Sequence, residues 1–259
     1  MQERHRNRLL YFNEQALTTE RYVIPFIEEV FPLCDGLRVL EIGCGEGGNL
    51  KPFLDRGFTC MGIDINAKQI ENACTFFSEH PHKDRLTLLA QDIYDWTDHP
   101  QFDLIMLRDV IEHIHNQERF MSFLTTFLAP RGMAFFGFPA WYMPFGGHQQ
   151  ICQSVLSKTP FIHLLPTTLY RGLLRLFKEN DSTIDELLEI KQTGITLERF
   201  ERIVKANNYQ IMKREYWFIQ PNYEVKFHLT KRAVWPVLRS IPYLRDFYTT
   251  AGYYCLTKC

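Results

Sequence analysis

Residues 37–64 read LRVLEIGCGEGGNLKPFLDRGFTCMGID. The pattern predicts a buried strand at 38–42, a glycine-rich turn, a helix that ends near Gly57, and a second strand that ends at Asp64. A strand, a glycine turn and a helix form the start of a βαβ unit, in which backbone N–H groups at the helix start can face a ligand. The segment therefore predicts a nucleotide-type site.

The charges around the glycine turn indicate which nucleotide fits. The G-x-G-x-x-G spacing at 43–48 also satisfies the dinucleotide pattern, which alone is a weak signal. Glu41 precedes the turn and Glu46 lies inside it, where two carboxylates would repel a diphosphate. S-adenosylmethionine has no phosphate and carries an ammonium and a sulfonium, so an acidic strand end suits it. Asp64 can accept hydrogen bonds from both ribose hydroxyls.

Five ordered motifs resemble those of class I S-adenosylmethionine-dependent methyltransferases. They are residues 41–47 (EIGCGEG), Asp64, 91–93 (QDI), 102–108 (FDLIMLR) and 128–132 (LAPRG). They span about residues 35–140, and five matches in order are more specific than one glycine motif. The resemblance implies S-adenosylmethionine as cofactor and a methyl-transfer reaction.

We expect the cofactor to lie along the carboxyl ends of the first strands. The acidic strand end and glycine turn would contact the methionine part, and Asp64 the ribose. The resemblance implies that Asp92 accepts from the adenine amino group and that Ile93 packs on the ring. The alternative for Asp92 is a loop cap, a common role of Asp at strand exits. The predicted cofactor-binding residues are Glu41, Gly43, Cys44, Gly45, Asp64, Ile65, Asp92, Ile93 and Arg108.

The wider pattern predicts an α/β fold. Apolar runs predict strands near 86–90, 102–107, 133–138, 209–219 and 252–256. Asn66 and Thr196 can each cap a helix, and the first of these helices should bury Ile70, Ala73, Cys74 and Phe77. The resemblance implies a Rossmann-like, seven-stranded sheet in the order 3-2-1-4-5-7-6, with strand 7 antiparallel and helices on both faces.

The chain is predicted to be one methyltransferase domain over 1–259. It comprises an N-terminal helical segment (1–34), a cofactor-binding core (35–139), a lid insertion (140–195), and the C-terminal part of the sheet (196–259) with an insertion at 221–248. A structureless loop as long as 140–195 would be unusual in a compact domain, so a helical and aromatic lid over the site is the better interpretation. Tyr11 and Tyr22 of the N-terminal segment would contact the ligand or, more often for such residues, pack in the core.

Composition narrows the function classes. A net charge of −1, from 29 basic and 30 acidic residues, gives no general signal for nucleic acid. Seven scattered cysteines without a CxxC motif indicate reduced thiols of a cytoplasmic protein. The charged N-terminus lacks the apolar region of a secretory signal. The longest apolar stretch, 133–147, contains two prolines and is too short to span a membrane.

Candidate chemistry gathers after the fourth strand. Asp109, Glu112 and His113 have the spacing i, i+3 and i+4, which would place them on one face of a helix at the carboxyl edge of that strand. His148 follows the fifth strand and should reach the same rim. These residues are the candidate catalytic groups, with His113 or His148 as general base, since an unperturbed histidine pKa of about 6.5 suits that role.

The same four residues form a candidate metal site. An acidic-x-x-Glu-His set with a later His is similar to the metal site of the O-methyltransferases of ubiquinone biosynthesis and of the small-RNA terminal 2′-O-methyltransferases. The resemblance implies a divalent ion that holds two substrate oxygens and lowers the pKa of the one to be methylated. Those families have Glu where this chain has Asp109, which has a shorter reach. Two imidazoles suit Mn²⁺ or Fe²⁺ better than Mg²⁺. The alternative is that Asp109 caps a helix and Glu112 favours its positive end.

The expected function is O-methylation of a small-molecule or lipid-linked acceptor by in-line displacement, which yields S-adenosylhomocysteine. The 221–248 insertion is basic and aromatic, so peripheral contact with an anionic membrane competes there with a solvated basic face. Two alternatives stay open: an NAD-dependent oxidoreductase that uses the glycine pattern at 43–48, and a methyltransferase-like binding protein without catalysis.

Overall fold

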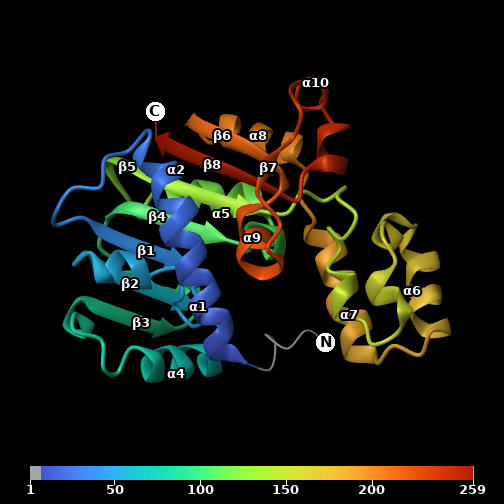
Figure 1. Ribbon diagram of the computed structural model, residues 1–259, viewed down its shortest axis with the longest axis horizontal. Helices are drawn as coiled ribbons and strands as arrows, with labels where there is room; N and C mark the ends of the chain where they lie inside the picture. Colours follow the sequence, from blue (N-terminus) through green and yellow to red (C-terminus); the bar gives the residue numbers. More distant parts are fainter. Residues whose placement is uncertain (1–6, 259) are drawn as a thin grey trace.

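Within residues 7–258, which the computed structural model describes, an eight-stranded sheet runs through the molecule (Figure 1). Its strands are β1 (Arg38–Ile42), β2 (Thr59–Asp64), β3 (Leu86–Ala90), β4 (Phe102–Arg108), β5 (Leu128–Phe138), β6 (Tyr209–Ile219), β7 (Arg232–Ala233) and β8 (Ala251–Lys258). Their order is β3-β2-β1-β4-β5-β8-β6-β7. The first five are parallel, and β8 is antiparallel to both β5 and β6. This arrangement confirms the predicted fold class.

The sheet differs from the prediction at one edge. The two-residue strand β7 comes from the 221–248 insertion and pairs with β6 opposite Trp217 and Ile219. Such a short pairing leaves no signal in the hydrophobic pattern, because a strand is recognised by alternation over at least four residues. The predicted order of the seven longer strands is confirmed.

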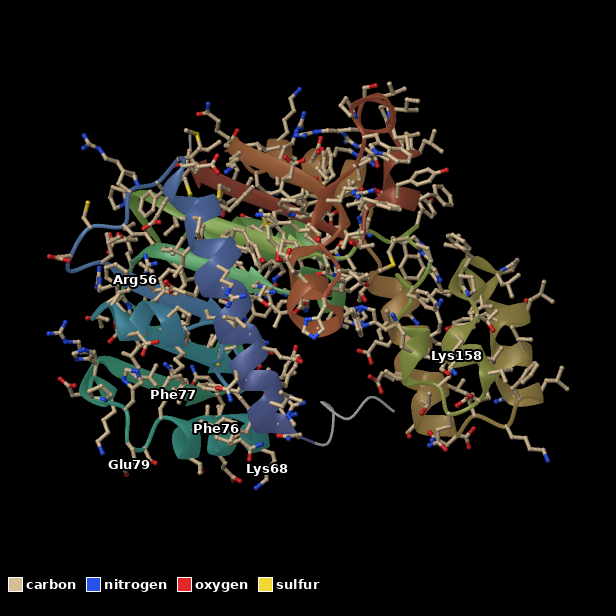
Figure 2. The ribbon with its side chains drawn as sticks, in the orientation of Figure 1. Arg56, Lys68, Phe76, Phe77, Glu79 and Lys158 are labelled. Atoms are coloured by element: carbon tan, nitrogen blue, oxygen red, sulfur yellow. The ribbon has the colours of Figure 1, made fainter. Side chains whose placement is uncertain are left out.

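Helices cover both faces of the sheet, as continuous apolar strands require. One face carries α1 (Arg8–Thr18), α2 (Ile24–Glu28), α3 (Lys51–Asp55) and α4 (Ala67–Phe76); the other carries α5 (Gln117–Leu124) and α8 (Leu197–Ala206). A π-helical turn, Thr19–Val23, joins α1 to α2. The N-terminal helix α1 packs at the end of α4 through Phe12, whose ring centroid lies 5.2 Å from that of Phe76 and 5.3 Å from that of Phe77. Figure 2 labels Phe76 and Phe77 at this end of α4.

The predicted helix caps are confirmed. The side chain of Asn66 accepts from the backbone N–H groups of Lys68 and Gln69, and that of Thr196 accepts from Arg199. Ile70 and Ala73 of α4 are buried as expected, but Cys74 is exposed, so its predicted place on the inner face is wrong. A single period-3.6 pattern fits positions next to the buried stripe almost as well as the stripe itself.

Residues 140–195 fold as a helical lobe beside the sheet (Figure 1). Its helices are α6 (Thr167–Leu176) and α7 (Asp181–Thr193), and they pack around a small core of their own. The second insertion contains α9 (Pro221–Phe227), which packs against α1, and α10 (Pro236–Arg239). No helix in 7–258 has both the length and the apolar character needed to cross a bilayer. The six cysteines in residues 7–258 are free thiols. The predictions for the N-terminus and for the cysteines also concern residues 1–6 and Cys259, which lie outside the described residues.

Candidate functional site

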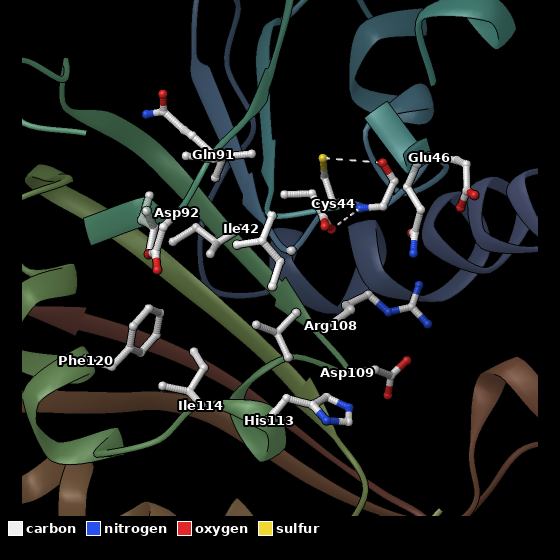
Figure 3. Close-up of a pocket in the computed structure, with 18 of the residues that line it drawn as sticks. Ile42, Cys44, Glu46, Gln91, Asp92, Arg108, Asp109, His113, Ile114 and Phe120 are labelled. Carbon is white, nitrogen blue, oxygen red and sulfur yellow. Dashed lines mark hydrogen bonds between the residues drawn. The ribbon is translucent and has the colours of Figure 1, made fainter. Parts of the chain in front are cut away.

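A cavity of about 610 Å³ opens at the carboxyl ends of the parallel strands (Figure 3). The carboxyl ends of β1, β2, β3 and β4 meet at this edge, which is where parallel sheets place their ligands. Eight of the nine predicted cofactor residues line it, namely Gly43, Cys44, Gly45, Asp64, Ile65, Asp92, Ile93 and Arg108. Asp92 and Phe120 lie toward one side of the view in Figure 3, and Arg108 and Asp109 toward the other.

Two glycines of the loop after β1 have left-handed backbone conformations, which disfavour most side chains. Gly43 and Gly45 have φ values of 68° and 54°. A Cβ on Gly43 would lie 2.5 Å from Cγ2 of Val110, and one on Gly45 would lie 2.6 Å from Oε1 of Gln69. The left-handed backbone thus favours glycine at both positions, and the close approach of Val110 favours it further at Gly43.

The backbone N–H groups of this loop are largely used inside the protein. Gly43 and Cys44 donate to the carbonyl of Ile63, at 2.8 and 3.2 Å, and Gly47 donates to the carbonyl of Cys44 at 2.8 Å. The N–H of Gly45 donates to the carboxylate of Asp64. A diphosphate is normally held by such N–H groups at the start of a helix. This loop therefore offers a diphosphate few donors.

Asp64 is held facing the cavity by two backbone donors. Its Oδ2 accepts from the N–H of Gly45 and its Oδ1 from the N–H of Asn66, both at 2.8 Å. A carboxylate has about four acceptor positions, so each oxygen can still accept one more hydrogen bond. The side chain is therefore oriented in advance for a pair of hydroxyl donors.

Glu41 lies behind the cavity, outside its lining, which differs from the predicted direct contact. Its side chain is 1% exposed, because neighbouring residues of a strand point to opposite faces and Ile42 takes the cavity side. Oε1 of Glu41 accepts from Nδ2 of Asn49 at 2.6 Å, and Oδ1 of Asn49 accepts from Arg108 at 2.6 Å. Burial raises the pKa of Glu41 to about 8, although the hydrogen bond from Asn49 and the charge of Arg108 act to lower it. Glu41 thus supports Arg108 through Asn49.

Glu46 is also buried, and Arg8 of α1 neutralises it through two hydrogen bonds. Nε of Arg8 donates to Oε1 of Glu46 at 2.6 Å, and a terminal guanidinium nitrogen of Arg8 donates to Oε2. With Glu41 largely protonated at neutral pH, neither carboxylate leaves a bare negative charge at the turn. These contacts weaken the predicted repulsion of a diphosphate by the two carboxylates, which stays a prediction. A diphosphate is disfavoured at this loop for two other reasons: the loop N–H groups already donate inside the protein, and the Asp64 carboxylate faces the same space.

The loop after β3 lines one part of the cavity. Asp92 Oδ1 accepts from the N–H of Tyr94 at 2.9 Å, so Asp92 caps the short turn 93–95. Ile93 is buried, and the ring of Tyr94 lies 6.5 Å from that of Phe120 in an edge-on contact. Both rings belong to the lining. This end of the cavity offers apolar surface beside a carboxylate, which suits a flat heterocycle with an amino group.

The predicted metal set is brought together in part. Glu112, His113 and His148 place one ligand atom each within 4.8 Å of one another, and the ring centroids of the two histidines are 5.0 Å apart. Asp109 is not in this group. The chain after β4 is no regular helix: Asp109 is left-handed, with φ 55°, and 111–113 form a 3₁₀ turn, so the helical spacing does not apply. The helix α5 begins only at Gln117, capped by Asn116.

The environment of these three residues resembles that of a cation site. Glu112 is 3% exposed, and neither of its carboxylate oxygens has a hydrogen-bond partner among the described residues. Burial, then the charge of Asp109, raises the pKa of Glu112 well above its ordinary range. A buried carboxyl without a partner is costly unless something compensates it. Glu112 therefore fits a ligand to a positive ion.

The two histidines are poor bases in this setting. Burial, followed by the charge of His113, lowers the pKa of His148 to about 3, and burial lowers the pKa of His113 as well. A general base works best with a pKa near the working pH, whereas a metal ligand must be neutral imidazole. The geometry and charge together favour ligands over a general base.

Several lining residues had no assigned role in the sequence pattern. They are Gln15, Gln69, Tyr94, Val110, Ile114, His115, Phe120 and Glu189. Gln69 had a usable signal, because side chains of a helix tilt toward its N-terminus and Asn66 already marks that start. Glu189 had none, since α7 reaches the cavity only through the packing of the helical lobe. The lobe contributes this one residue to the lining of the cavity, and its predicted role as a lid stays a prediction. Tyr11 lines the cavity and Tyr22 does not.

Comparisons with known proteins agree with this geometry. A family model described as a methyltransferase domain matches residues 15–212. A ubiquinone biosynthesis O-methyltransferase of Rickettsia felis is 30% identical over 113 residues, 44% of this chain and 46% of that protein. The chain thus matches about half the length of that relative. The corresponding protein of Rickettsia canadensis is 22% identical over 80% of this chain and 81% of its own length.

Solved structures show the same fold at low identity. An S-adenosylmethionine-dependent methyltransferase from Clostridium acetobutylicum has a TM-score of 0.59 at 13% identity, over 94% of this chain and 92% of its own. A geranyl diphosphate C-methyltransferase from Streptomyces coelicolor has a TM-score of 0.58 at 13% identity, over 91% and 74%. These likenesses concern the arrangement of the sheet and helices.

Proposed function

The chain belongs to the methyltransferase family whose domain model spans residues 15–212, and on that premise we propose that it moves the methyl group of S-adenosylmethionine to an oxygen of a small-molecule or lipid-like acceptor. The cofactor leaves as S-adenosylhomocysteine. The observation that carries the O-methylation proposal is the group of Glu112, His113 and His148, of which His113 lines the cofactor cavity.

The cavity suggests where each part of the cofactor lies. Asp64 binds the two ribose hydroxyls with the acceptor positions that Gly45 and Asn66 leave open. Asp92 and Ile93 bind the adenine, with Tyr94 and Phe120 beside it. The methionine part lies along the glycine loop, where it contacts Gly43, Cys44, Gly45 and Arg108. Arg108 is a charged donor at 8% exposure, suited to the carboxylate of the methionine.

Methyl transfer is an in-line displacement. An oxygen lone pair of the acceptor forms the new bond to the methyl carbon while the carbon–sulfur bond breaks, and the electron pair of that bond neutralises the sulfonium. The protein has to align the oxygen with the carbon–sulfur bond and exclude water. The proton of the acceptor hydroxyl passes to solvent water, because the weak basicity of His113 and His148 argues against a histidine as the primary base.

We assign Glu112, His113 and His148 as the side chains that would hold a divalent cation. One carboxylate and two neutral imidazoles suit Mn²⁺ or Fe²⁺ better than Mg²⁺. When bound, such an ion lowers the pKa of an acceptor hydroxyl as a Lewis acid. Glu112 and the two histidines would orient that hydroxyl at the rim, and Asp109, which lies outside the group but lines the cavity, would face the acceptor.

Two alternatives make different predictions. Titration calorimetry with S-adenosylhomocysteine, NAD and ATP separates them: the proposal requires binding of S-adenosylhomocysteine alone. Binding of NAD alone would support an oxidoreductase, and binding of none would support a protein without catalysis. Activity toward a panel of phenols, sugars and lipid-linked hydroxyls, with and without a chelator, then tests the acceptor and the ion. Methyl transfer only to amines or carbon acids would contradict O-methylation.

A further inference from the structure

The segment 225–245 combines positive charge with exposed apolar side chains. It reads VKFHLTKRAVWPVLRSIPYLR and contains five lysines and arginines and no acidic residue. It includes β7 and α10, and Figure 1 shows α10 projecting at the rim of the molecule beyond β7. Nothing in the methyl-transfer proposal uses this segment.

The apolar side chains of the segment face solvent. Trp235 is 61% exposed, Val237 73% and Tyr243 57%. Phe227, Leu229 and Ile241 are also exposed. Trp235 stacks on Phe218 of β6, at 6.2 Å between ring centroids, and Phe218 is itself 40% exposed. Isolated exposed apolar residues are common, but this number within one short segment marks an interaction surface.

The five basic residues differ in their contacts, and Lys226 lies over the ring of Tyr11, 5.2 Å from its centroid. Arg239 pairs with Glu215 of β6, and Arg245 pairs with Glu198 of α8, so these two fasten the segment to the sheet. Lys231 and Arg232 are exposed and shortly precede Trp235, and the ammonium of Lys231 lies 4.5 Å from the ring centroid of Tyr22 and 5.5 Å from that of Trp217. The fold therefore presents cations next to exposed aromatic and aliphatic side chains on one projecting segment.

We propose that the 225–245 segment docks the protein on an anionic membrane surface, with Trp235 and Val237 entering the interface and Lys231 and Arg232 facing lipid headgroups. Trp and Tyr favour the membrane–water interface, and clustered Lys and Arg near a surface favour anionic lipids. Interfacial binding depends on the apolar area that is buried and on attraction to anionic lipid, and apolar side chains beside cations supply both.

A second copy of the chain fits this surface less well. A two-fold contact would place the same patch against itself. Lys231 and Arg232 of both copies would then approach one another, and Glu224, which accepts from the backbone N–H of Lys231 at 3.1 Å, would offset only part of that charge. An anionic bilayer meets the same cations with opposite charge.

Vesicle sedimentation tests the proposal, with vesicles of phosphatidylcholine alone and of phosphatidylcholine mixed with phosphatidylglycerol. The intact protein should bind the anionic vesicles at least roughly fivefold more tightly than the neutral ones. The double variant Trp235→Ser, Val237→Ser should bind anionic vesicles roughly tenfold more weakly. Lys231→Gln, Arg232→Gln should reduce the preference for anionic lipid.

The helical lobe provides a matched control. Leu169 and Leu176 of α6 are 61% and 74% exposed, and the variant Leu169→Ser, Leu176→Ser should bind vesicles as the intact protein does. All variants should bind S-adenosylhomocysteine normally, so a failure of docking is distinguishable from a failure of the proposed activity. Equal binding to both vesicles, or loss of binding only in the α6 variant, would overturn the proposal. So would a dimer in vesicle-free solution that Trp235→Ser, Val237→Ser dissociates.

Discussion

The carboxylate of Asp64 accepts a hydrogen bond from the backbone N–H of Gly45, with 2.8 Å between Oδ2 and N. This contact joins the end of β2 to the loop after β1, 19 residues earlier in the chain. It uses a backbone donor that a diphosphate would need and turns the carboxylate toward the cavity. One hydrogen bond thereby shapes the loop and orients the predicted ribose ligand.

Replacement of Asp64 by Ala should weaken the binding of S-adenosylhomocysteine by ~1.5 to 3 kcal/mol, because hydrogen bonds to an ionised group are lost. Titration calorimetry measures the change directly. Asp64→Asn is the control, since it keeps an acceptor for the N–H of Gly45 and loses the charge. Its affinity for S-adenosylhomocysteine should lie between those of the intact protein and Asp64→Ala. If Asp64→Ala bound as tightly as the intact protein, the ribose assignment would be wrong.

The pH dependence of stability should show whether Glu41 is protonated in the folded protein. Its folded-state pKa of about 8 exceeds the ordinary value of 4.5, so the folded protein holds an extra proton between these values. Stability present below pH 4.5 is lost as the pH rises through about 8. Glu41→Gln removes this loss, so its free energy of unfolding at pH 9 should exceed that of the intact protein by on the order of a few kcal/mol, with little difference near pH 4.5.

Chemical denaturation at several pH values tests this expectation. Asp246 is a second buried carboxyl whose pKa burial raises, to about 7. Asp246→Asn therefore serves as a comparison with a transition at lower pH. An identical pH slope in Glu41→Gln and in the intact protein would show that Glu41 stays ionised in the folded state.

Glu112→Gln should lower the affinity for Mn²⁺ by at least roughly tenfold, because it removes the only carboxylate of the group. Electron paramagnetic resonance of free Mn²⁺ measures this without turnover. Asp109→Asn is the matched control and should leave Mn²⁺ affinity nearly unchanged, since Asp109 lies outside the group. A larger loss with Asp109→Asn than with Glu112→Gln would restore the set expected from helical spacing.

Two glycine substitutions should have opposite effects on stability. Gly43→Ala should destabilise by more than ~1 kcal/mol, because the left-handed backbone disfavours a Cβ and that atom would approach Val110 at 2.5 Å. Gly172→Ala lies within α6 with nothing within 4 Å of its Cβ. It should stabilise by roughly 0.5 to 1 kcal/mol. Thermal unfolding compares the two, and a neutral Gly43→Ala would show that the loop adapts.

The glycine loop and the caps at Asn66 and Thr196 could be predicted because each depends on residues close together in the sequence, whereas the order of the long strands was predicted from the family resemblance. Periodicity reports which side of an element is buried, and a cap needs only its own first turn. The two-residue β7 and the 3₁₀ turn after β4 could not be predicted in this way. Both are too short to carry a period, and the second depends on a left-handed Asp109.

By itself, then, the sequence determined the βαβ core, the family resemblance and the edge of the sheet where the cavity opens. Only the tertiary structure decided what each charged side chain at that edge does. Arg8 neutralises Glu46 from 38 residues away, Asn49 connects Glu41 to Arg108, and His148 joins Glu112 while Asp109 stays outside. The reason is physical: the state of a buried charge depends on its spatial partners, and those come from distant parts of the chain.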